Sequence, residues 1–209
     1  SLSGKTPRSD NNFLNKQYAH AVAFQRRVGI RRAELARLKG SDLVRDESGH
    51  LCVRVRRGKG GKMQLQRILP GDIAFIQSYF AGKAPNEPIF SKAELRNKLA
   101  YHYLRAMQAQ RAYKYYEKRV RTKAGRAELE EEIRRRWSKY NLNPRTGKPK
   151  RLGPKLLRGF YFLRGDNKHF AITHGLPTKY DRLALLAVSI FHLSHWRNDV
   201  TAESYMLVV

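Results

Sequence analysis

One antiparallel hairpin does most to determine the fold class of this chain. Residues 51–57 alternate apolar and basic side chains, as a strand with one buried face does, and residues 63–70 form a second strand-like run. The glycine-rich stretch 58–61 between them favours a tight turn that joins adjacent strands. Most other apolar residues recur at helical spacing. These patterns predict a mostly α-helical protein with a small antiparallel β-sheet, an α+β fold.

Helical periodicity covers much of the remaining chain. Helical segments are expected at residues 12–39 with a break at Gly29, 71–80, 91–140 with a break near 122–125, 156–163 and 182–193. A polar loop is expected between the last two segments. The long segment carries three acid-to-base pairs at helical spacing, Glu130–Arg134, Glu131–Arg135 and Glu132–Arg136. That spacing favours salt bridges on a solvated helix face.

Length bounds the domain organisation. A chain of 209 residues can form one substantial hydrophobic core. The sequence shows no internal repeat, so we expect a single domain over residues 1–209 with a helical insertion at about 91–150. The abrupt start at Ser1 leaves room for an N-terminal DNA-binding domain upstream of this chain.

The charge balance points to a polyanionic partner. Lysine and arginine number 43 against 17 acidic residues, which gives a net charge of +26. Each phosphate that such a chain neutralises releases condensed counterions, so nucleic acid is the expected partner. A membrane surface is less suitable, because the basic residues are spread over several elements and no long apolar run is present.

The single cysteine bears on the compartment. Cys52 has no intrachain cysteine with which to form a disulfide, which favours a reducing compartment. We therefore expect a cytoplasmic protein. Within the first strand, Cys52 itself is interpreted as a small apolar residue rather than a catalytic thiol.

Three separated motifs carry residues suited to metal-free phosphoryl transfer. The stretch 29–35 places an arginine at the opening of an apolar helix, Lys59 lies in the glycine turn, and Tyr205 follows Trp196 near the C-terminus. An arginine can hold two phosphate oxygens, a lysine can donate a proton, and a tyrosine can attack phosphorus. In order and surroundings, these motifs resemble those of the tyrosine recombinase (phage integrase) family.

The first motif fits the family's first arginine box, which has Gly, an aliphatic residue, Arg, two variable residues, Glu and Leu. The resemblance implies that Arg31 clamps the scissile phosphate and that Glu34 supports the arrangement. If the helix is rotated, Arg32 instead contacts backbone phosphates and Arg31 packs elsewhere. In the hairpin turn, Lys59 is expected to be the general acid that protonates the leaving 5′-oxygen, and Lys62 to contact phosphate.

The second arginine box of the family is usually Pro-His-x-Leu-Arg-His at the start of a helix. The stretch 154–159 fits it if Lys155 takes the place of the histidine, and Arg158 is then the second phosphate clamp. This Lys-x-x-Arg form is similar to that of archaeal virus integrases and hairpin telomere resolvases. Arg158 is farther from the tail motif than is usual in the family, so Arg182, in a second Lys-x-x-Arg at 179–182, remains an alternative.

The tail motif supplies the nucleophile. The resemblance implies that Tyr205 attacks the scissile phosphate and that Trp196, where relatives have His or Trp, donates a hydrogen bond to it. His195 takes that role instead if the register slips by one position. His192 and His195 also have the spacing of a metal pair, but no third ligand stands at a suitable distance in the sequence, and no metal is expected.

Together, the resemblance implies a site-specific DNA recombinase or integrase of a mobile genetic element. It also implies a place in the cytoplasm of a prokaryotic cell, at the nucleoid, or wherever the target DNA resides. Such an enzyme breaks and rejoins DNA through a 3′-phosphotyrosyl intermediate, needs neither metal nor ATP nor another cofactor, and acts as a homodimer or homotetramer on paired sites. A hairpin telomere resolvase, a type IB topoisomerase and a noncatalytic basic nucleic-acid-binding protein remain alternatives. Further DNA contacts are expected from Arg32, Arg56, Arg57, Lys62, Lys148, Lys150 and Arg151.

Overall fold

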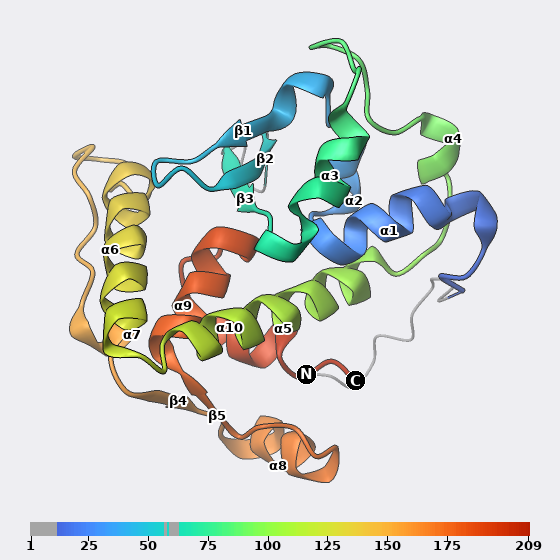
Figure 1. Ribbon diagram of the computed structural model, residues 1–209. Coiled ribbons are helices and arrows are strands. Elements are labelled where there is room, and N and C mark those ends of the chain that lie inside the picture. Colours follow the sequence, from blue (N-terminus) through green and yellow to red (C-terminus); the bar gives the residue numbers. More distant parts are fainter. Residues whose placement is uncertain (1–11, 57, 59–62) are drawn as a thin grey trace.

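The computed structural model describes residues 12–56, 58 and 63–209. Arg57, Lys59 and Lys62 therefore lie outside the described residues, and with them the expected general acid of the hairpin turn. The described chain is mostly helical with a small antiparallel sheet, which confirms the α+β prediction (Figure 1). None of the helices in this part of the chain combines the length and apolar character needed to cross a lipid bilayer.

The elements follow the chain in this order. The first half contains α1 (Ala19–Val28), α2 (Arg32–Leu35), β1 (Leu43–Arg45), β2 (Leu51–Val55), β3 (Gln64–Arg67), α3 (Ile73–Phe80), α4 (Lys92–Leu95) and α5 (Tyr101–Arg119). The second half contains α6 (Lys123–Tyr140), α7 (Pro154–Leu157), β4 (Phe160–Phe162), α8 (Gly165–Thr173), β5 (Lys179–Asp181), α9 (Arg182–Val188), the π-helical turn η5 (Ser189–Leu193) and α10 (Asn198–Tyr205). Short 3₁₀ turns lie at Lys16–Tyr18, Gly40–Asp42 and Pro70–Asp72.

The strands of the predicted hairpin, β2 and β3, are two of the three strands of a sheet in which β2 is central. β2 pairs with β3 in antiparallel register, with Val53 opposite Gln66, and β1 adds to the other edge of β2. Cys52 is buried in β2, and burial raises the pKa of its thiol to about 12. A thiol so far from ionisation is a poor nucleophile, in agreement with its interpretation as a packing residue.

The predicted break at Gly29 is confirmed, and the structure requires glycine there for two reasons. Gly29 ends α1 with φ +68°, in the left-handed region that glycine adopts without strain. A side-chain carbon at this position would also lie 3.1 Å from Cβ of Gln108, because α5 crosses closely. The glycine thus turns the chain toward α2 and lets α5 pass against it.

Two hydrophobic cores meet on α5, and we call the polar layer between them the seam. The N-terminal core gathers α1, the hairpin and α3 with Leu104 of α5, and the C-terminal core gathers α6, α9 and α10 with Ala109 of α5. Figure 1 shows α5 running through the middle of the molecule, between α1 and α9. The sequence predicts this helix within an insertion at about 91–150, whereas its buried face completes both cores.

At the seam, a buried histidine joins elements of both cores. His192 is fully buried, accepts a hydrogen bond at Nδ1 from Nε2 of Gln108 (3.1 Å), and its Nε2 lies 3.1 Å from the hydroxyl of Tyr116. Nε2 therefore carries the proton of the neutral ring. Burial, reinforced by Arg67 and other nearby arginines, lowers the pKa of His192 to about 3.

This histidine predicts a pH dependence of stability. The folded pKa of about 3 lies below the ordinary 6.5, so the unfolded chain binds more protons as the pH falls through 6.5. The free energy of unfolding should then decrease by up to roughly 1.4 kcal/mol per pH unit below about pH 6. Urea unfolding across this range measures the slope, and His192→Gln, which cannot titrate, should flatten it. An equal slope in that variant contradicts the prediction.

A second part of the seam is a cluster of buried charges, which we call the charge cluster: Asp46, Arg67, Glu132 and Arg136. The carboxylate of Asp46 accepts from Nε of Arg67 (2.7 Å) and Nη2 of Arg136 (2.8 Å), and Arg67 also pairs with Glu132 (2.5 Å). The predicted Glu132–Arg136 pair is thus wrong, since both side chains turn inward to the hairpin. The other two predicted pairs, Glu130–Arg134 and Glu131–Arg135, form on the exposed face.

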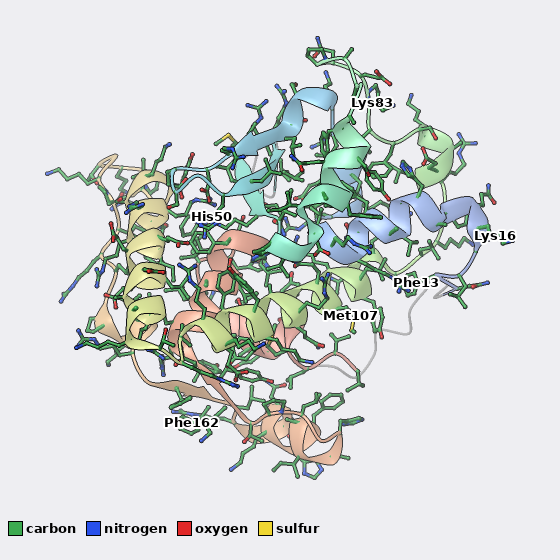
Figure 2. The ribbon with its side chains drawn as sticks, viewed as in Figure 1. Phe13, Lys16, His50, Lys83, Met107 and Phe162 are labelled. Carbon is green, nitrogen blue, oxygen red and sulfur yellow. The ribbon has the colours of Figure 1, made fainter. Side chains whose placement is uncertain are left out.

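The predicted helix at 156–163 is wrong. Helix α7 ends at Leu157, Gly159 has φ +73°, and the aromatic run from Phe160 forms β4, which pairs with β5. Adjacent aromatic residues favour an extended chain, and the left-handed glycine stops the helix. β4, β5 and α8 form an arm that projects from the body, with Phe162 exposed on it (Figure 2); α8 lies where the sequence predicts a polar loop.

Candidate active site

The end of α10 places a tyrosine against a histidine. Tyr205 is 5 % exposed, and its phenol oxygen lies 2.9 Å from Nε2 of His195, within hydrogen-bond distance. The ring of His102, at the start of α5, also contacts Tyr205, with ring centres 5.3 Å apart. Because an imidazole can accept a phenol proton, this arrangement supplies a nucleophile with an adjacent base.

A buried arginine packs beside this tyrosine. Arg105 on α5 is 1 % exposed, and its guanidinium carbon lies 5.8 Å from the centre of the Tyr205 ring. It donates from Nη1 to the carbonyl oxygen of Gly29 (2.5 Å) and from Nη2 to that of Leu193 (2.9 Å), while its Nε has no hydrogen-bond partner in the described structure. Burial lowers the pKa of Arg105, Tyr205 opposes the shift, and Arg31 adds to it. Two guanidinium groups whose charges act on each other favour an anion near both.

Arg105 is not among the residues predicted from the sequence, although a signal for it is present. Residues 102–105 read His-Tyr-Leu-Arg at the start of a helix, so they contain the His-x-Leu-Arg centre of the family's second arginine box. No proline precedes them, and they fall in the segment for which the sequence predicts an insertion. The structure brings this stretch, rather than 154–159, to Tyr205.

Arg31 reaches the site from the other core. It is the residue before α2, its backbone N–H donates to Oε2 of Glu34 (2.8 Å), and its Nη1 donates to Oε1 of the same carboxylate (2.7 Å). Glu34 is buried, so the pair fixes the guanidinium direction while Arg31 keeps part of its surface in solvent. This is the supporting role that the sequence assigns to Glu34.

The residues proposed for the second box lie elsewhere. Lys155 and Arg158 are exposed on and just after α7, and no contact between Arg158 and either Arg31 or Tyr205 is found among the described residues. Arg182 donates to the carbonyl oxygens of Lys155 (2.6 Å) and Phe160 (3.0 Å), so it holds the base of the arm. The geometry therefore does not support Lys155, Arg158 or Arg182 as a phosphate clamp, because none is brought to the tyrosine.

The structure places His195, not Trp196, against the nucleophile. Ser194 and Trp196 both have positive φ, 55° and 61°, in the left-handed region that bulky residues rarely adopt. With these two residues in place, the side chain of His195 points to Tyr205. The indole of Trp196 points away from Tyr205 and packs edge-on against Trp137, with ring centres 5.8 Å apart. The register alternative of the sequence analysis is thus the one that the geometry favours.

The expected DNA-contacting residues divide into two groups. Arg32 donates to the carbonyl oxygens of Leu95 and Leu99 and to Asn97, so it closes the loop before α5 and is not free for phosphate. Arg56 is half exposed but pairs with Asp42. The lysines and arginine of the loop after α6, Lys148, Lys150 and Arg151, are exposed, and the last two line a cavity.

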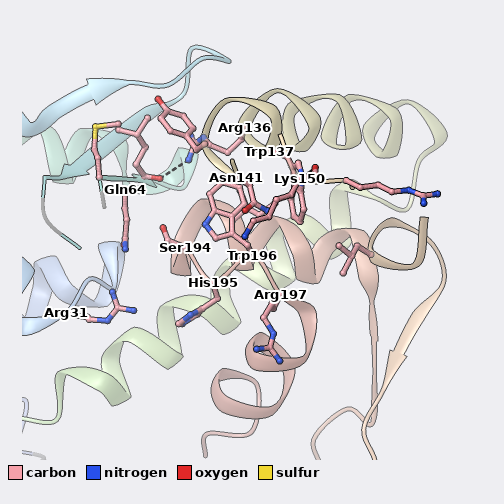
Figure 3. Close-up of a pocket in the computed structure, with 16 residues that line it drawn as sticks. Arg31, Gln64, Arg136, Trp137, Asn141, Lys150, Ser194, His195, Trp196 and Arg197 are labelled. Carbon is pink, nitrogen blue, oxygen red and sulfur yellow. Dashed lines mark hydrogen bonds between the residues drawn. The ribbon is translucent and has the colours of Figure 1, made fainter. Parts of the chain in front are cut away.

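This cavity has a volume of about 800 Å³ and lies between the hairpin, α6 and the C-terminal segment (Figure 3). Figure 3 shows Arg31 and His195 on the same side of it and the paired indoles of Trp137 and Trp196 across from them. Nε1 of Trp137 donates to the carbonyl oxygen of Lys150 (2.7 Å), which holds the basic loop at the cavity wall. The wall is therefore aromatic and basic, next to the tyrosine site.

No protein-family model, curated protein or solved structure matches this chain. Its chemistry must be argued from the arrangement itself. That arrangement consists of a buried tyrosine with an adjacent imidazole, two arginines from different parts of the chain, and a basic surface beside them. Such a set can bind a phosphate diester and attack it.

Proposed function

We propose that this protein is a DNA strand transferase of the tyrosine recombinase kind, with the catalytic-domain fold of that family. The observation that carries the proposal is the meeting of Arg31, Arg105, His195 and Tyr205, which come from distant parts of the sequence and converge at one place in the fold. The net charge of +26 supports duplex DNA as the substrate.

In the proposed reaction, the phenol oxygen of Tyr205 attacks the scissile phosphorus. A phosphorus–oxygen bond forms to the tyrosine, and the bond to the 5′-oxygen breaks, so that the DNA 3′-phosphate becomes linked to the protein. The phenol proton passes to Nε2 of His195, and the leaving 5′-oxygen takes a proton from an acid, for which the sequence predicts Lys59. Arg31 and Arg105 stabilise the charge that develops on the nonbridging oxygens.

The reverse reaction reseals a strand. A 5′-hydroxyl attacks the phosphotyrosine, Tyr205 leaves with the proton returned by His195, and no bond energy is lost to water. Neither a metal ion nor ATP is needed to drive this exchange. Because Tyr205 and Arg105 are both almost fully buried, we expect α10 to shift when DNA binds, so that the scissile phosphate can enter between the arginines.

The test is a covalent adduct. The protein is incubated without metal with short duplexes of randomised sequence, each nicked so that the freed 5′-end diffuses away and resealing is prevented. We expect a protein–DNA species that survives denaturation, and peptide mapping by mass spectrometry should place the nucleotide on Tyr205. An adduct on another of the 11 tyrosines, or tight DNA binding with no adduct at all, would overturn the proposal.

A further inference from the structure

The cavity beside the tyrosine site has the chemistry of a nucleobase site. Its volume of about 800 Å³ falls in the range of roughly 300–1,000 Å³ that is usual for small-molecule sites. Trp137 and Trp196 form one wall, and Tyr140 also lines it. Flat aromatic rings bind bases by stacking, whatever the base, at a strength of about 1–3 kcal/mol per base.

Cations around the same cavity suit the phosphate of a nucleotide. Lys150 and Arg151 line it, and no salt bridge from either to a carboxylate is found in the described part of the chain. Arg31 also lines it, from the side of the tyrosine site. A nucleotide placed here would therefore stack its base on the indoles while its phosphates face basic side chains, continuous with the proposed scissile phosphate.

The backbone at Trp196 is held in an unfavourable conformation that keeps its indole in this wall. A tryptophan with φ 61° is strained, and the strain persists only where the surrounding structure enforces it. Hydrogen bonds hold the segment on both sides: His195 N–H donates to the carbonyl oxygen of Ser189 (3.0 Å), and Arg197 N–H donates to Oγ of Ser189 (2.9 Å). The tyrosine site needs only the direction of His195, whereas the half-buried indole of Trp196 packs against the C-terminal core and lines the cavity.

We propose that this cavity binds an unpaired nucleotide next to the scissile phosphate, with its base stacked on Trp196. A base inside a duplex is already stacked and cannot enter, so the preferred substrate has an extrahelical or single-stranded nucleotide at the cleavage site. This inference rests on the proposed strand transfer for its biological setting, but the binding itself can be measured apart from catalysis.

The chain offers a direct optical test, because its only two tryptophans both line this cavity. The Tyr205→Phe protein, which cannot form the adduct, is titrated with single-stranded oligothymidine and with a fully paired duplex containing the same number of nucleotides, at one salt concentration. Oligothymidine should quench the tryptophan emission strongly, and the duplex should leave it nearly unchanged. Equal quenching by the two probes would overturn the proposal.

A variant series measures the role of Trp196. In binding followed by the anisotropy of labelled DNA, Trp196→Ala should weaken oligothymidine binding roughly tenfold and duplex binding by less than about twofold, and Trp196→Phe should restore most of the loss. Lys148→Ala, on the exposed part of the same loop, is the matched control: it should weaken both probes by a similar factor. An unchanged ratio of the two affinities in Trp196→Ala contradicts the inference.

The two proposals fail in distinguishable ways. Quenching by oligothymidine with no covalent adduct in the unmodified protein would leave the nucleotide site standing and overturn strand transfer. An adduct on fully paired duplexes, with no quenching by oligothymidine, would leave strand transfer standing and overturn the nucleotide site.

Discussion

Arg105→Lys should lower the rate of covalent adduct formation by roughly 10²–10³-fold, the cost of removing a preorganised charge-stabilising donor. Lysine keeps the positive charge beside Tyr205 but cannot hold two phosphate oxygens at once. Lysine is also the better choice than alanine for this test. Arg105→Ala would leave the buried carbonyl oxygens of Gly29 and Leu193 without donors, and each such loss costs about 1–3 kcal/mol of stability.

The yield of adduct is measured against time with the pool of nicked duplexes, and the Tyr205→Phe protein gives the background signal. Arg158→Ala is the matched control, because the sequence predicts Arg158 as the second clamp whereas the structure leaves it exposed and away from the tyrosine. The Arg158→Ala protein should form the adduct at a rate within about twofold of the unmodified protein, once any loss of salt-dependent DNA binding is taken into account. The assignment of Arg105 fails if Arg158→Ala is the slower variant of the two.

The second large effect concerns stability. Asp46→Asn should lower the free energy of unfolding by about 3–5 kcal/mol, the usual cost of leaving a buried charge without its partner. Asparagine keeps the oxygen that accepts from the backbone N–H groups of Ser48 and His50, so the loop should keep its shape. What is lost is the negative charge between Arg67 and Arg136, both of which are buried.

Urea denaturation followed by circular dichroism measures this change. Glu131→Gln is the matched control, since its pair with Arg135 is exposed to solvent and should contribute less than about 1 kcal/mol. A loss of less than about 1 kcal/mol in Asp46→Asn would show that the charge cluster does not stabilise the seam.

The same carboxylate gives the effect a pH dependence. Burial alone would raise the pKa of Asp46, but Arg67 and Arg136 outweigh burial and hold that pKa below its ordinary value. A depressed pKa means that the stabilisation is complete above the unfolded value of about 3.9 and is lost as the pH falls through the folded one. The difference between the unmodified protein and Asp46→Asn should therefore shrink in strong acid.

Much of the N-terminal half could be predicted from the sequence, because its signals are local. Gly29 marks a left-handed helix end, and the glycines after residue 57 mark a hairpin, whatever the rest of the chain does. The contact between Arg31 and Glu34 could be predicted for the same reason, since the two residues interact within one turn of chain.

The remainder of the site depends on contacts between distant segments. Arg105 lies on a helix that carries several other basic residues, and only the packing of both cores against α5 shows that it is buried. An arginine in a basic helix is usually exposed to solvent, so the sequence alone does not indicate that Arg105 of the His-x-Leu-Arg stretch is buried at a site. Similarly, the choice between His195 and Trp196 depends on two left-handed residues, which nothing in their residue types indicates.

The division of the molecule at α5 has a consequence for how safely such an enzyme could handle DNA. Arg31 follows Ile30 of one core, Tyr205 belongs to the other, and Arg105 donates to a carbonyl oxygen from each side, those of Gly29 and Leu193. Separation of the halves would take Tyr205, the proposed nucleophile, away from the arginines that would stabilise the charge of the proposed reaction. If the protein is the strand transferase that we propose, a partly unfolded copy would therefore be unable to cut DNA.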